Sequence, residues 1–247
     1  MIDLTTVYVV LIVFVATFIR SAFGFGEGLI AVPLLAFFIP LTIAVPLGVL
    51  VSITVALIVV LQDWEKIHLR SAAWLLVSTL PGIPLGLLLL TGGHQAIVKG
   101  LLAVIIIAFS AYSRIGRRPE LHQESRAWLF VCGLTAGILG GAFGMNGPPL
   151  VVYGSMRRWS AQQFRATLQA YFLPASLVAM AGFLASGLWV HEVTRCYLWS
   201  LPLSIPAILL GRFVNHRLAG EMFLTYVYVG LLVIGGLLLA QVAGVHL

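Results

Sequence analysis

Two clusters rich in glycine and proline interrupt the apolar stretches of this chain, and each could bind an anion. Such clusters cannot continue a helix, so each should precede a short helix, predicted to begin at Leu29 and at Leu150. A helix N-terminus carries about half a positive charge and free N–H donors, and glycines before it let an oxyanion approach the backbone. The alternative is that the glycines only allow close packing of helices. The candidate substrate-binding residues in the two clusters are Gly24, Gly26, Glu27, Gly28, Gly144, Asn146, Gly147 and Pro148.

Polar side chains inside or beside the apolar segments add further candidates. The guanidinium fork of Arg20 or of Arg165 could bind a sulfonate or a carboxylate, although Arg165 could equally extend to the membrane surface. Gln169 lies one helical turn after Arg165 and shares its face. Glu27 has two interpretations, because a buried charge is costly. It is either a proton-coupling carboxylate, alternately charged and neutral, or a glutamate near a water-filled vestibule that pairs with Arg20 or another cation.

The composition places these residues in a membrane protein. Of the 247 residues, 61% are hydrophobic and 9% are charged, which excludes a soluble domain and a disordered chain. An outer-membrane barrel would alternate apolar and polar residues, whereas residues 101–109 are continuously apolar. The predicted fold class is therefore an all-α polytopic membrane protein.

Eight apolar segments are long enough to span a bilayer, which takes about 20 residues. Two shorter apolar runs, 29–39 and 150–156, follow the glycine clusters, and 11 helical residues cover only about 16 Å. The long candidates are 4–22, 42–61, 72–90, 96–113, 127–143, 161–188, 196–213 and 221–241.

Basic residues at the segment ends predict the orientation. If each short run reverses the direction of the chain across the membrane, ten of twelve such basic residues lie on the same side of the membrane. If the short runs do not reverse it, seven of the twelve lie on one side and five on the other. The positive-inside rule favours the first division. The loop 114–126 is then cytoplasmic and both termini are periplasmic.

The two halves of the chain resemble each other. The tripeptide 22–24, Ala-Phe-Gly, recurs at 142–144. Further along each half, Trp64, Arg70, Leu85 and Gly86 recur in the same order as Trp189, Arg195, Leu210 and Gly211. An odd number of crossings in each half makes the repeats inverted, an architecture of secondary transporters. We expect repeats at 1–113 and 127–247 joined by the cytoplasmic linker 114–126, each with about four long helices and one short broken or re-entrant helix.

Other functional classes lack support in the sequence. The histidines have no metal-ligand spacing, no nucleophile–base pair stands out, and the glycines at 24, 26 and 28 lack the βαβ context of a nucleotide site. We therefore expect no catalytic residue, metal or cofactor. The net charge of +6 arises at segment ends, so we expect no nucleic-acid binding either.

Two motifs resemble those of the TauE/SafE family, also called the toluene sulfonate uptake permease family. Residues 24–35, Gly-Phe-Gly-Glu-Gly-Leu-Ile-Ala-Val-Pro-Leu-Leu, resemble its first signature, and residues 140–153, Gly-Gly-Ala-Phe-Gly-Met-Asn-Gly-Pro-Pro-Leu-Val-Val-Tyr, resemble its second. The resemblance runs from about residue 10 to 240. It departs at Glu27, where the family tends to have another glycine, and a carboxylate there would repel an anion unless it is protonated.

The resemblance implies a sulfite or organosulfonate exporter, or a permease for a related small anion. Together with the residue analysis, it predicts a secondary transporter that moves a small anion across the cytoplasmic membrane, coupled to an ion such as the proton. The alternative is an anion channel, or a permease for another small sulfur compound or a carboxylate. The expected partners are the anion, protons and the lipid bilayer, and the sequence leaves open whether the chain forms a homodimer.

Overall fold

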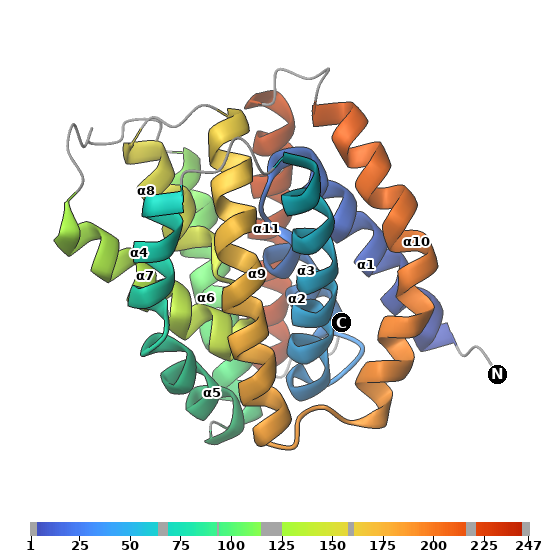
Figure 1. Cartoon of the computed structure of the whole chain (residues 1–247). Helices are drawn as coiled ribbons and strands as arrows, with labels where there is room; N and C mark the ends of the chain where they lie inside the picture. Colours follow the sequence, from blue (N-terminus) through green and yellow to red (C-terminus); the bar gives the residue numbers. More distant parts are fainter. Residues whose placement is uncertain are drawn as a thin grey trace.

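A computed structural model describes residues 4–63, 69–92, 94–114, 125–157, 161–215 and 221–243. Within these ranges all secondary structure is helical, which confirms the predicted fold class (Figure 1). The helices are α1 (Leu4–Phe23), α2 (Glu27–Leu35), α3 (Leu41–Asp63), α4 (Leu69–Thr79), α5 (Gly82–Gly92), α6 (Gln95–Arg114), α7 (Arg126–Phe143), α8 (Gly147–Met156), α9 (Ala161–Ala185), α10 (His191–Asn215) and α11 (Glu221–Val242).

Six of the described helices, α1, α3, α6, α7, α9 and α10, are long and apolar enough to cross a bilayer. The helices α4 and α5 together are long and apolar enough for a further crossing, but they are bent by 45° at their break, as in a broken span or a re-entrant loop. The candidate segment 72–90 is therefore helical and apolar as expected, but it consists of two helices with a break between them. Pro81 lacks a backbone N–H and disfavours helical geometry at Leu80, so the chain breaks between the two helices.

The short helices occur where the glycine clusters predicted them, but each begins earlier than expected. The helix α2 starts at Glu27 rather than Leu29, and α8 starts at Gly147 rather than Leu150. A first helical turn accepts residues that a helix interior rejects, because its N–H groups have no intrahelical partner. The chain breaks upstream, where Gly24 and Gly144 have φ angles of 85° and 64° that L side chains rarely adopt.

Close packing of helices reproduces the internal repeat. The helix α1 packs on α10, and its counterpart α7 packs on α4 and α5. A Cβ atom on Gly211 would lie 2.7 Å from the carbonyl oxygen of Phe18, and one on Gly86 would overlap the carbonyl oxygen of Ile138, which is 120 residues after Phe18. Two further pairs of contact residues keep the same offset: Ser21 with Gly141, and Ala22 with Ala142.

The exchange of packing partners between the halves is what a pseudo-two-fold axis produces, since each half offers the same face to the other. In Figure 1 the helix α9 descends through the bundle and α10 ascends beside α1. The inverted orientation of the halves in a membrane, and the division at 1–113 and 127–247, stay predictions. The middle of the linker 114–126 lies outside the described residues.

Candidate functional site

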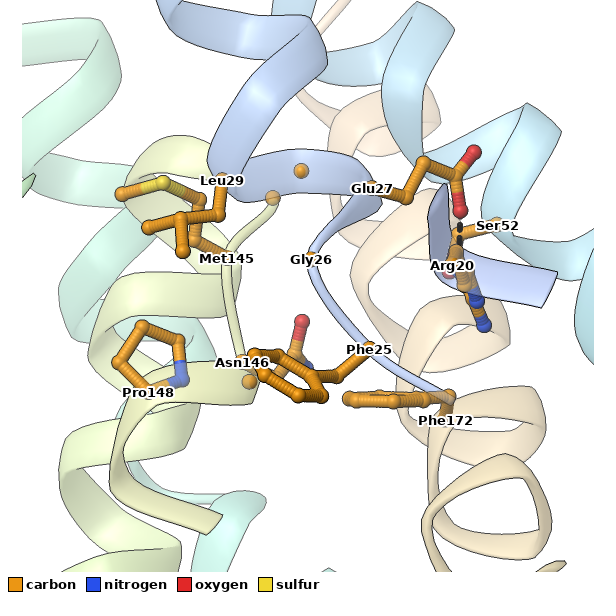
Figure 2. A pocket seen from close by; sticks show the side chains of 13 residues that line it. Arg20, Phe25, Gly26, Glu27, Leu29, Ser52, Met145, Asn146, Pro148 and Phe172 are labelled. Carbon is orange, nitrogen blue, oxygen red and sulfur yellow. Dashed lines mark hydrogen bonds and ion pairs between the residues drawn. The ribbon is translucent and has the colours of Figure 1, made fainter. Parts of the chain in front are cut away.

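The two helix breaks meet at one small cavity. The first break joins α1 to α2, the second joins α7 to α8, and a Cβ atom on Gly28 would overlap the carbonyl oxygen of Gly144. The cavity has a volume of about 20 Å³ (Figure 2). Its lining consists of Arg20, Phe25, Gly26, Glu27, Gly28, Leu29, Ser52, Gly144, Met145, Asn146, Gly147, Pro148 and Phe172.

The structure therefore brings together most of the candidate residues. Gly24 does not line the cavity, but its carbonyl oxygen accepts a hydrogen bond of 2.9 Å from the side-chain amide of Gln169. Arg165 lies in α9, and its side chain is outside the described part of the structure, so its role stays a prediction.

Arg20 is the central cation of the site. Its side chain extends from α1, and the residue is only 3% exposed. It forms an ion pair with Glu27 of α2 and donates hydrogen bonds to Ser52 Oγ of α3, at 2.6 Å, and to Gln169 Oε1 of α9, at 2.8 Å. The ring of Phe172 packs against the guanidinium, 4.9 Å from its carbon, and adds a cation–π contact. Side chains from three other helices thus fix the guanidinium, which limits the cost of burying its charge.

The ion pair matches one of the two interpretations of Glu27, the one that pairs it with Arg20. The pairing is incomplete, however. Among the described residues, Arg20 Nε and Glu27 Oε1 are buried without a hydrogen-bond partner. One donor and one acceptor therefore remain for another molecule, because buried polar groups are normally satisfied.

The two ends of the helix α2 differ in how their backbone groups are satisfied. Its N-cap, Gly26, has a φ angle of 102°, and no side chain caps the first turn. Its last carbonyls lie near α6, where Lys99 Nζ donates a hydrogen bond of 2.8 Å to the carbonyl oxygen of Ala36. A cation at a helix C-terminus stabilises the helix dipole, so this contact helps to hold the start of α2 at the cavity.

The start of α8 supplies fewer donors than the sequence analysis expected. Asn146 precedes the helix, and the second and third helical residues are Pro148 and Pro149, which have no N–H. Of the first three residues only Gly147 retains a backbone donor. The two helix starts therefore contribute unequally: α2 can direct three N–H groups at an anion and α8 only one.

A second polar chain leads away from Asn146. The side chain of Asn146 hydrogen-bonds to the hydroxyl of Tyr171 in α9, which lies 2.8 Å from Thr79 Oγ1 in α4. Thr79 also donates towards the carbonyl oxygens of Leu75, at 2.8 Å, and Gly133, at 3.0 Å. Tyr171 and Thr79 were missed in the sequence, as were Ser52, Phe172 and Ser176, whose hydroxyl lies 3.2 Å from that of Ser52. Isolated serines, threonines and aromatics in apolar helices carry no spacing signal.

No group of three or more histidine, cysteine, aspartate or glutamate side chains that could hold a metal occurs in the described ranges. The charged side chains that line the cavity are those of Arg20 and Glu27, and their opposite charges cancel. The dipoles of α2 and α8 add partial positive charge at the helix starts. The arrangement is suited to a small anion.

The comparisons with known proteins agree with this chemistry. A protein of Cupriavidus necator named as a probable sulfite/organosulfonate exporter TauE is 26% identical to this chain over 211 residues, which are 81% of this chain and 79% of that protein. No solved structure matches the chain. The model of the family described as sulfite exporter TauE/SafE matches residues 9–239, which include both glycine clusters and every residue that lines the cavity. The chain therefore belongs to the TauE/SafE family of membrane transporters.

Proposed function

We propose that this protein is a secondary transporter that moves sulfite or an organosulfonate across the cytoplasmic membrane. The main support for the proposal is the buried guanidinium of Arg20, which lies where the break between α1 and α2 meets the break between α7 and α8. Interrupted helices that meet inside a bundle are the substrate sites of many secondary transporters. A guanidinium fork and the free N–H groups of α2 are complementary to the oxygens of a sulfur oxyanion.

An incoming anion competes with Glu27 for Arg20. A carboxylate within about 5 Å of an anion repels it by about 3 kcal/mol at an effective dielectric constant of about 20. A Glu27 carboxylate that loses its cationic partner is also a buried, unpaired charge. We therefore infer that Glu27 takes up a proton as the anion binds, so that one proton moves with each anion.

The size of the cavity supports a cycle of conformations. A volume of about 20 Å³ is room for one water molecule and too little for a sulfonate. The described conformation then lacks room for the substrate, which binds after the helices separate. Such opening and closing is expected of a transporter rather than of an open channel.

Purified protein in proteoliposomes tests this function. Vesicles preloaded with unlabelled sulfite should accumulate labelled sulfite by counterflow, and uptake should increase when the outside is acidified. If labelled sulfite and organosulfonates neither bind nor cross the membrane, the proposal is wrong. If flux occurs without counterflow, the protein is a channel.

The variant Glu27→Gln tests the coupling separately. Glutamine keeps an oxygen for Arg20 but cannot titrate. Binding of an organosulfonate, whose own charge does not change with pH in this range, should therefore persist and lose its pH dependence. In wild type, anion affinity should rise as pH falls, because binding takes up a proton. Glu192→Gln is the matched control, since it removes a half-exposed carboxylate that pairs with Arg195 at 2.7 Å, away from the cavity. Identical pH profiles for wild type and Glu27→Gln would show that the Arg20–Glu27 pair is only structural.

A further inference from the structure

The hydroxyl of Thr79 fixes the direction of a chain of hydrogen bonds. A hydroxyl donates one hydrogen, and a carbonyl oxygen can only accept. Thr79 Oγ1 lies within hydrogen-bond distance of the carbonyl oxygens of Leu75 and Gly133, so its hydrogen is committed to them. In its contact with Tyr171, at 2.8 Å, Thr79 must therefore accept and the tyrosine must donate.

The direction of this contact determines how the amide of Asn146 is oriented. Because the hydrogen of Tyr171 is directed to Thr79, the tyrosine oxygen can only accept from Asn146. The amide nitrogen Nδ2 is the only donor in that side chain. It therefore faces Tyr171, and the amide oxygen Oδ1 is on the opposite side. In Figure 2 this oxygen points towards the turn at Gly26, into the cavity that Asn146 lines.

The oxygen of Asn146 lacks the two backbone donors that usually satisfy it in its own helix. An asparagine before a helix normally accepts from the N–H of the second or third helical residue. Here those residues are Pro148 and Pro149, which have no N–H. The asparagine cannot cap α8, and its oxygen is available to a ligand in the cavity.

We propose that Asn146 Oδ1 selects anions that carry a hydrogen-bond donor of their own, with Tyr171 and Thr79 as its positioning residues. The inference rests on the proposed function, because it takes the cavity as the anion site. Hydrogen sulfite and hydroxylated sulfonates have such a donor, whereas simple alkanesulfonates of the same charge do not. An alkanesulfonate would leave the buried oxygen unmatched, which should weaken its binding at least about tenfold.

The test compares anions of equal charge that differ in one hydroxyl group. Dissociation constants are measured on purified protein for hydrogen sulfite and methanesulfonate at mildly acidic pH, and for isethionate and ethanesulfonate. The hydroxylated member of each pair should bind at least about tenfold more tightly. Equal affinities within both pairs would overturn the inference while leaving the proposed function intact. Absence of binding by all four anions would overturn both.

The variant Thr79→Val provides a readout that a purely structural role would not change. Valine has nearly the same shape but cannot accept a hydrogen bond, so the hydroxyl of Tyr171 becomes free to donate to Asn146 Oδ1. The amide then turns, Nδ2 faces the cavity, and the preference within each pair should shrink or reverse. Tyr171→Phe should also reduce the preference, and Thr79→Ser, which keeps the hydroxyl, should restore that of wild type.

A matched control exists in the same bundle. Thr54 of α3 contacts the hydroxyl of Tyr197 in α10 at 2.7 Å, and neither residue lines the cavity. Thr54→Val should leave the preference unchanged. A Thr79→Val protein that binds all four anions more weakly by the same factor, or a Thr54→Val protein with the same altered preference, would overturn the inference.

Discussion

The contact between the two helix breaks makes Gly28 the most sensitive position in the site. A Cβ atom there would lie 3.0 Å from the carbonyl carbon of Gly144 and would overlap its oxygen. Both atoms belong to the backbone, so no side-chain rotation can relieve the clash. The φ angle of Gly144 is 64°, which holds that carbonyl in a turn with little freedom to move.

Gly28→Ala should therefore separate the two breaks. Inserting a methyl group into a closely packed site typically costs about 1–3 kcal/mol, and a clash with backbone is at the upper end of that range. Because the start of α2 also directs its N–H groups at the cavity, moving it should weaken anion binding as well. We expect a lower unfolding temperature in detergent and at least a tenfold loss of affinity, since 1.4 kcal/mol corresponds to a factor of ten.

The assay measures thermal unfolding with and without sulfite, together with uptake into proteoliposomes. Gly236→Ala is the control, because a Cβ atom there would meet no atom within 4 Å and alanine favours a helix by up to about 1 kcal/mol. That variant should unfold at or above the wild-type temperature and transport normally. If Gly28→Ala matches Gly236→Ala in both measurements, the two breaks do not depend on this contact.

Three further predictions concern the amide, the repeat and the topology. Asn146→Leu should abolish transport and leave the unfolding temperature nearly unchanged, since it removes both polar atoms but keeps the branched shape and the number of heavy atoms. Gly86→Ala and Gly211→Ala should lower the unfolding temperature by similar amounts, because each places a methyl group against the equivalent turn of its partner helix; a large difference would contradict the repeat. Reporter fusions should place Leu247 in the periplasm and Gly116 in the cytoplasm, and a cytoplasmic C-terminus would refute the inverted topology.

The sequence was sufficient to predict where helices stop at the site. Glycine and proline act through local sterics, so the breaks before α2 and α8 could be predicted without tertiary information. Proline alone was a weaker signal. Pro81 separates α4 from α5, whereas Pro202 lies inside the continuous helix α10. The surrounding packing, rather than the proline itself, decides between these outcomes.

The polar partners of the site could be predicted only in part. Glu27 follows Arg20 by seven residues across a break, and their opposite charges made pairing one of two interpretations. Ser52 and Tyr171 are isolated polar residues on helices far away in the sequence, so nothing local connects them with the cavity. Their roles follow from helix packing, which a single sequence does not specify.

The polar groups of the site also show how a repeat can yield an asymmetric cavity. At the offset of 120 residues that relates α1 to α7, Arg20 corresponds to Gly140, and Gly26 corresponds to Asn146. The first half thus supplies a cation where the second has no side chain, and the second supplies an amide where the first has none. A Cβ atom on Gly140 would lie 2.7 Å from Asn146 Nδ2, so the glycine is what gives the amide its space. Exchanging the pattern by Gly140→Arg would therefore displace Asn146 instead of adding a second cation site, because the two positions compete for one volume.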